Sequence, residues 1–170
     1  MKIGVIGAGT MGAGIAEVMS KHYDVVVRDI SEEFVERGRN TITKSFEKAV
    51  AKERITAEQK DEYLGRLNFT TDVNELKDCD LIIEAASENP EIKKSIFKEL
   101  CELCDEKTIL ASNTSSISIT EIAAATGRAD RVIGMHFFNP ATVMKLVELI
   151  KGLTTSDETV AKVKEITEAI

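Results

Sequence analysis

Short apolar segments alternate along this chain with longer stretches in which apolar residues recur at helical spacing. Such alternation predicts strands separated by helices, which is the pattern of an α/β domain. Several of the short segments are apolar throughout, as is typical of parallel strands covered by helices on both faces. We therefore expect a doubly wound, mostly parallel sheet of the Rossmann type. The predicted strands are residues 2–6, 24–29, 68–71, 80–85, 108–113, 131–137 and 144–150.

Helices are expected between these strands, and several of their predicted starts carry capping residues. A Ser or Thr followed three residues later by Glu or Gln has the spacing of a capping box, in which the two side chains bond free backbone N–H groups. An Asn directly before Pro suits an N-cap followed by the first helical turn. These signals fall at Thr56 with Gln59, Ser118 with Glu121, Thr155 with Glu158, and Asn89 with Pro90.

The connection between the second and third predicted strands is longer than one crossover helix needs, and residues 31–66 contain two helical patterns. We therefore expect a pair of helices to protrude from the domain at this point. Ile42, Phe46 and Val50 form a narrow apolar stripe on the first of them. A lysine row at the same spacing on another face is either a solvated surface or a cationic ledge for an anionic ligand. Its members are Lys44, Lys48 and Lys52.

Composition narrows the classes of protein to consider. The 170 residues suffice for one domain with a hydrophobic core, and a net charge of −7 argues against binding to nucleic acid. No apolar run approaches the roughly 20 residues that span a membrane, and no signal segment opens the chain, so a cytoplasmic location is expected. Cys101 and Cys104 have a C-x-x-C spacing but lie in an amphipathic stretch, where we expect them to pack a helix rather than bind metal.

A glycine-rich turn follows the first predicted strand directly. Gly7, Gly9 and Gly12 form a G-x-G-x-x-G pattern just before a helix that is expected to begin near Met11. In that context the glycines permit a tight turn, close approach of a pyrophosphate and close helix packing, while the helix N-terminus offers free N–H donors. The pattern predicts a dinucleotide-binding loop that also includes Thr10 and Met11.

Asp29 stands at the end of the second predicted strand, about 20 residues beyond the glycines. A carboxylate at this position accepts hydrogen bonds from the adenosine ribose and repels a 2′-phosphate. We therefore predict NAD as the cofactor in preference to NADP, although the neighbouring Arg28 is expected to soften the preference.

Polar residues lie at or just beyond the carboxyl ends of three of the later predicted strands, and these ends line the same crevice in an open α/β sheet. A histidine there can take a proton from a hydroxyl while hydride leaves the adjacent carbon, and Ser and Asn can hold the oxygen. Glu148 interrupts an apolar strand and is a candidate partner for the histidine; alternatively, it faces solvent and the histidine caps a turn. The crevice candidates are Glu84, Glu88, Asn113, Ser115, His136 and Asn139.

Four stretches of the chain resemble the 3-hydroxyacyl-CoA dehydrogenase family, and most closely its bacterial members that act on 3-hydroxybutyryl-CoA. They are GAGTMGAGIA, DLIIEAASE, ILASNTSSISITEIA and VIGMHFFNPATVMKLVELI. The resemblance implies His136 as the catalytic acid or base, Glu148 as its orienting partner, and Ser115 and Asn139 as contacts of the substrate oxygen and the nicotinamide side. It also implies that Glu88 and Lys93 line the cofactor site, and it favours the lysine row as a coenzyme A contact.

The same resemblance implies that residues 1–170 are an NAD-binding domain whose family relatives continue into a helical domain that forms a dimer and contributes to the substrate site. The expected reaction interconverts 3-hydroxybutyryl-CoA and acetoacetyl-CoA, and the isolated chain is expected to be weakly active or inactive. Three alternatives remain open at this point: a cofactor-binding module without turnover, a dehydrogenase of free β-hydroxy acids, and a redox-sensing NAD-binding module.

Overall fold

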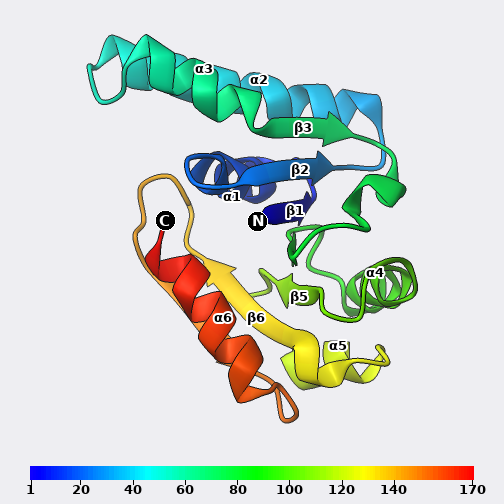
Figure 1. Ribbon diagram of the computed structural model, residues 1–170. Coiled ribbons are helices and arrows are strands. Elements are labelled where there is room, and N and C mark those ends of the chain that lie inside the picture. Colours follow the sequence, from blue (N-terminus) through cyan, green and yellow to red (C-terminus); the bar gives the residue numbers. More distant parts are fainter.

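The computed structural model describes all residues, 1–170, and places seven strands in one sheet of order β3-β2-β1-β4-β5-β6-β7 (Figure 1). Strands β1 to β6 run parallel, and β7 pairs antiparallel with β6. This architecture confirms the predicted doubly wound, mostly parallel sheet. The strands are β1 (Lys2–Ile6), β2 (Asp24–Arg28), β3 (Leu67–Thr70), β4 (Leu81–Glu84), β5 (Ile109–Ser112), β6 (Val132–Phe137) and β7 (Val147–Lys151).

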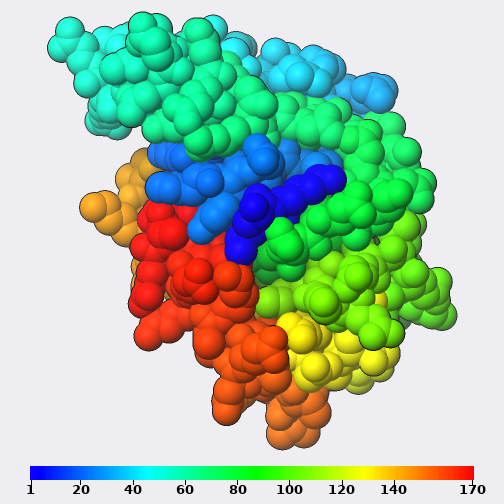
Figure 2. Space-filling view, viewed as in Figure 1, coloured from blue at the N-terminus to red at the C-terminus, as the bar shows by residue number.

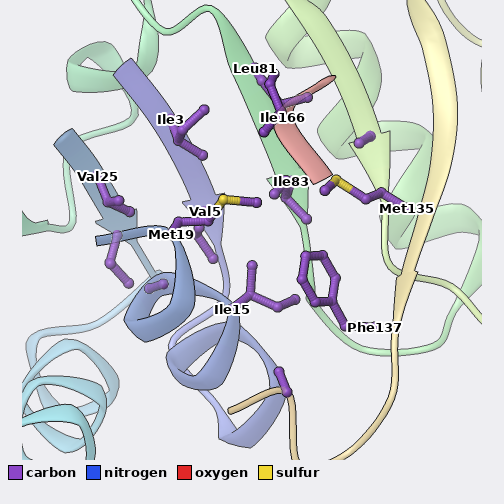
Figure 3. Close-up of a cluster of buried hydrophobic side chains, with 14 of the residues drawn as sticks. Ile3, Val5, Ile15, Met19, Val25, Leu81, Ile83, Met135, Phe137 and Ile166 are labelled. Carbon is purple, nitrogen blue, oxygen red and sulfur yellow. The ribbon is translucent and has the colours of Figure 1, made fainter. Parts of the chain in front are cut away.

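Helices cover both faces of the sheet, and alternate residues of the five central strands supply the two cores. Ile3 and Val5 of β1 join the core beneath α1 and α6, shown in Figure 3, whereas Ile6 joins the core beneath α4 and α5. The helices are α1 (Thr10–Ser20), α2 (Glu32–Ala51), α3 (Ala57–Gly65), α4 (Pro90–Leu103), α5 (Ile119–Ala124) and α6 (Asp157–Glu168), with short 3-10 turns at Val73–Leu76 and Ala129–Arg131. None of them is both long enough and apolar enough to cross a membrane.

Helices α2 and α3 form the expected protruding pair, which overhangs the rest of the molecule at the upper left of Figure 2. The apolar stripe of α2 anchors the pair, because Ile42 and Phe46 are buried and the Phe46 ring lies 5.6 Å from the Tyr63 ring of α3. The predicted capping box is present: the Thr56 side chain accepts from the Gln59 N–H, and the Gln59 side chain accepts from the Thr56 N–H.

The predicted start of the last helix was wrong by one residue. Ser156, not Thr155, is the N-cap of α6, and its hydroxyl accepts from the Thr159 N–H. Thr155 is buried instead, and its hydroxyl donates to the Val132 carbonyl at 2.7 Å. This long-range bond ties the turn after β7 to the start of β6, and no local sequence pattern predicts it.

The last strand also begins later than predicted, at Val147 rather than at residue 144. A turn after Pro140 occupies the preceding residues, since the N–H groups of Val143 and Met144 both donate to the Pro140 carbonyl. Cys104 is buried in the core at the end of α4 as expected, and burial raises the pKa of its thiol to about 11, whereas Cys101 of α4 is only partly buried.

Candidate active site

The strand order reverses between β1 and β4, so a crevice opens at their carboxyl ends. The glycine turn lies there with the geometry that its sequence predicts. Gly7 has a φ of +98°, and a Cβ atom on Gly12 would lie 1.9 Å from the Gly7 carbonyl oxygen. A Cβ atom on Gly9 would meet nothing within 4 Å, and α1 begins at the next residue without a side-chain cap. The open backbone and the free helix N-terminus therefore fit a pyrophosphate.

Asp29 lies beside the glycine turn and is bonded to its backbone. One of its carboxylate oxygens accepts from the Ala8 N–H at 2.7 Å, and the other accepts from the Ile30 N–H at 2.7 Å. It lines a cavity of about 650 Å³ together with the glycine turn. The remaining acceptor capacity of the fixed carboxylate suits ribose hydroxyl groups, so the residues present fit the adenosine half of a dinucleotide.

A second cavity of about 590 Å³ continues from the first, because Gly9, Ala85, Ala86 and Ser87 line both. The two cavities form one crevice that runs from Asp29 past the start of α1 to the end of β6. In addition to Gly9, the second cavity brings together seven of the predicted site residues from four separate segments of the chain. These are Thr10, Met11, Glu88, Asn113, Ser115, His136 and Asn139.

His136 and Glu148 face each other across the β6–β7 pair, where the antiparallel register sets them directly opposite. The His136 Nδ1 atom lies 3.0 Å from a Glu148 carboxylate oxygen, and the Phe138 ring packs 4.7 Å from the imidazole. Glu148 therefore contacts the histidine even though half of its side chain is exposed. The contact commits Nδ1 to the carboxylate and leaves Nε2 as the nitrogen available to a ligand.

The other predicted residues divide into those that reach the crevice and those that do not. Asn113 reaches it and accepts from the Phe137 N–H at 2.8 Å, which ties β5 to the end of β6. Lys93 does not line either cavity, because it is only 1% exposed and pairs with Glu84 behind the crevice wall. The lysine row consists of two residues of α2 and the residue that follows the helix, and all three are exposed, have no carboxylate partner and line neither cavity: Lys44, Lys48 and Lys52.

Several lining residues escaped the sequence analysis. Ile30, Phe34 and Arg37 line the first cavity at or before the start of α2, where the sequence pattern had indicated only Arg28 and Asp29. Their position just beyond the carboxyl end of β2 was an available signal, because such loops border the crevice in this type of sheet. Phe138 was also missed, and its place between His136 and Asn139 was the signal.

Comparison with known proteins agrees with this geometry. Residues 2–170 match the family model described as 3-hydroxyacyl-CoA dehydrogenase, NAD binding domain. The chain belongs to this family. Its cofactor is therefore NAD, in agreement with the fit of the glycine turn and Asp29.

Relatives of this NAD-binding domain include a 3-hydroxybutyryl-CoA dehydrogenase of Bradyrhizobium diazoefficiens, which is 47% identical over 96% of the chain and 56% of its own length. A 3-hydroxyadipyl-CoA dehydrogenase of Escherichia coli is 49% identical over 97% of the chain and 35% of its own length. The crystal structure of (S)-3-hydroxybutyryl-CoA dehydrogenase from Ralstonia eutropha superposes with a TM-score of 0.96 at 48% identity, covering 98% of the chain and 59% of that protein. The chain thus spans less than two thirds of the length of each of these relatives.

Proposed function

We propose that this chain carries the cofactor site and the acid–base pair of an NAD-dependent dehydrogenase that interconverts 3-hydroxyacyl-CoA and 3-oxoacyl-CoA. The observation that carries the proposal is the 3.0 Å contact between His136 and Glu148 at the end of a crevice that begins at the glycine turn. The relatives described above are named for CoA-linked substrates, which supports the substrate class. The four-carbon pair 3-hydroxybutyryl-CoA and acetoacetyl-CoA is the favoured substrate couple.

NAD, when bound, supplies the acceptor for the hydride that leaves carbon 3 of the hydroxyacyl group. His136 takes the hydroxyl proton at Nε2 during oxidation and returns it during reduction. Glu148 holds the ring through Nδ1 and stabilises the positive charge that the ring acquires. The Ser115 hydroxyl and the Asn139 amide hold the substrate oxygen, since both residues line the cavity that His136 closes.

The test is a fluorescence titration with NADH and, at the same ionic strength, with NADPH, followed by NADH oxidation in the presence of acetoacetyl-CoA. We expect saturable binding that is tighter for NADH and, at the low rate expected of this chain by itself, oxidation that depends on acetoacetyl-CoA. If free acetoacetate oxidises NADH as fast as acetoacetyl-CoA does, the protein is instead a dehydrogenase of free β-hydroxy acids. If NADH binds but neither compound oxidises it, the chain is a cofactor-binding module without turnover.

A further inference from the structure

A ring of hydrogen-bonded polar groups lies behind the wall of the crevice, and the reaction described above uses none of its buried members. It joins the end of β4, the first turns of α4 and the loop after β5. Two of its charged groups are almost fully enclosed: Glu84 is 0% exposed and Lys93 is 1% exposed. Charges are rarely buried this deeply unless they are paired, so the function of this pair needs an explanation.

Glu84 and Lys93 form the centre of the ring. The Lys93 ammonium lies 2.8 and 3.0 Å from the two carboxylate oxygens of Glu84. Glu84 also accepts from the Ser112 hydroxyl at 2.8 Å and from the Ala86 N–H at 2.7 Å. These contacts occupy both oxygens of the carboxylate, so Glu84 is held firmly between β4 and β5 and is not available to a ligand.

Glu88 connects this centre to the crevice. One of its oxygens lies 3.5 Å from the Lys93 ammonium, and the other accepts from the Thr114 hydroxyl and from the Ser115 N–H, the latter at 3.2 Å. The Thr114 N–H donates to the Ser112 hydroxyl at 3.3 Å, which closes the ring. Partial burial raises the pKa of Glu88, but the Thr114 hydroxyl, the Lys93 ammonium and the Ser115 N–H outweigh it and leave the pKa below its ordinary value.

We propose that the buried Glu84–Lys93 pair positions Glu88, and that Glu88 in turn holds the backbone of Ser115 beside His136. Ser115 lies on a loop, where no regular backbone ladder fixes its direction, yet it lines the same cavity as His136. The ion pair prevents the half-exposed Glu88 side chain from turning into solvent, and the bond to the Ser115 N–H transmits that constraint to the loop. The inference rests on the proposed dehydrogenase function, in which the Ser115 hydroxyl holds the substrate oxygen.

The test variant replaces both buried charges, Glu84→Gln together with Lys93→Met, because removal of one alone would leave the other unpaired. Gln retains an oxygen for the Ala86 N–H, and Met retains most of the lysine stem. We expect hydrogen exchange at the Ser115 amide to become about tenfold faster, and kcat/KM for acetoacetyl-CoA to fall about tenfold. The matched control, Lys94→Met, removes a neighbouring lysine that pairs with Glu91 on the surface of α4, and it should change neither quantity.

A double-mutant cycle with Ser115→Ala separates positioning from a general structural role. If the pair acts through Ser115, the combined variant should lose little more kcat/KM than Ser115→Ala alone. If the substitutions act independently, their fold-losses in kcat/KM should multiply. Glu88→Gln, at a partly exposed position, should show the same non-additivity and provides the test if the buried double variant does not fold. If the fold-losses in kcat/KM multiply, or if hydrogen exchange at the Ser115 amide is unchanged, the proposal is wrong. The exchange measurement needs no turnover, so absence of dehydrogenase activity in the unaltered protein would count against the proposed function only.

Discussion

At the scale of single residues, the site depends on one imidazole whose two nitrogens have different surroundings. Nδ1 of His136 contacts Glu148, and in the proposed reaction Nε2 takes the proton of the substrate hydroxyl. Replacing His136 with Gln in the active enzyme should lower kcat by roughly a hundredfold or more, because proton transfer in the transition state is lost. NADH affinity, measured by fluorescence titration, should change little. Retained turnover would show that the proton is transferred by another group.

Glu148 is expected to contribute through the histidine rather than through the substrate. Glu148→Gln keeps the side-chain volume and an oxygen near Nδ1 but removes the charge that stabilises the protonated ring. We expect a lower kcat and an altered pH dependence of kcat, with NADH affinity unchanged. An unaltered pH–rate profile would contradict the assignment of the pair.

Asp29 carries the prediction on cofactor choice. Its carboxylate is fixed by the N–H groups of Ala8 and Ile30 at the edge of the first cavity. Asp29→Ala should weaken NADH binding and strengthen NADPH binding relative to it, because the repulsion of a 2′-phosphate is removed. Parallel titrations with the two cofactors measure the change in their ratio, and an unchanged ratio would rule out Asp29 as the selectivity residue.

At the scale of secondary-structure elements, α1 and α2 meet through a buried carboxylate. Glu17 of α1 is 6% exposed and accepts from the Ser45 hydroxyl of α2 at 2.7 Å. Burial raises the pKa of Glu17, although Ser45 and Lys21 partly offset the effect. Because the folded pKa lies above the unfolded one, the stability that this group contributes is present at acid pH and is lost as the pH rises through the folded pKa.

Glu17→Gln should therefore stabilise the protein at pH 7, on the order of 1 kcal/mol, since it removes a buried charge and keeps an acceptor for Ser45. The difference from the unaltered protein should shrink below the ordinary glutamate pKa. Urea unfolding at acid and neutral pH measures both effects, with the exposed Glu47→Gln on α2 as the control. A difference that does not depend on pH would exclude the buried charge as its cause.

At the scale of the whole molecule, the α2–α3 pair extends away from the sheet (Figure 2), and the side chains of the lysine row are exposed. We expect the row to attract the phosphates of an acyl-CoA. Replacing Lys44, Lys48 and Lys52 together with Gln should raise KM for acetoacetyl-CoA roughly tenfold, since three exposed charge contacts of about 0.5 kcal/mol each total about 1.5 kcal/mol. The effect should diminish at high salt, and kcat should change little.

A control for overall charge replaces three lysines of other helices, Lys98, Lys162 and Lys164, with Gln. If the control raises KM as much as the α2 variant does, the effect comes from net charge and the lysine row is only a solvated surface.

The sequence by itself determined the sheet, the protruding helices, the glycine turn and Asp29. Each of these follows from local periodicity or from neighbouring residues, which act through short-range backbone geometry. Local patterns did not predict the start of α6 correctly, because the Thr155 hydroxyl bonds the distant Val132 carbonyl and does not cap the helix.

Only the tertiary structure decided which distant side chains meet. His136 reaches Glu148 because β7 runs antiparallel to β6 in one register, and a shift of one residue would turn Glu148 to the other face. Likewise, Lys93 was expected to line the cofactor site, but the packing of α4 against the sheet places it beneath the wall in contact with Glu84. Such contacts depend on how separate elements pack, and local sequence patterns carry no direct record of that packing.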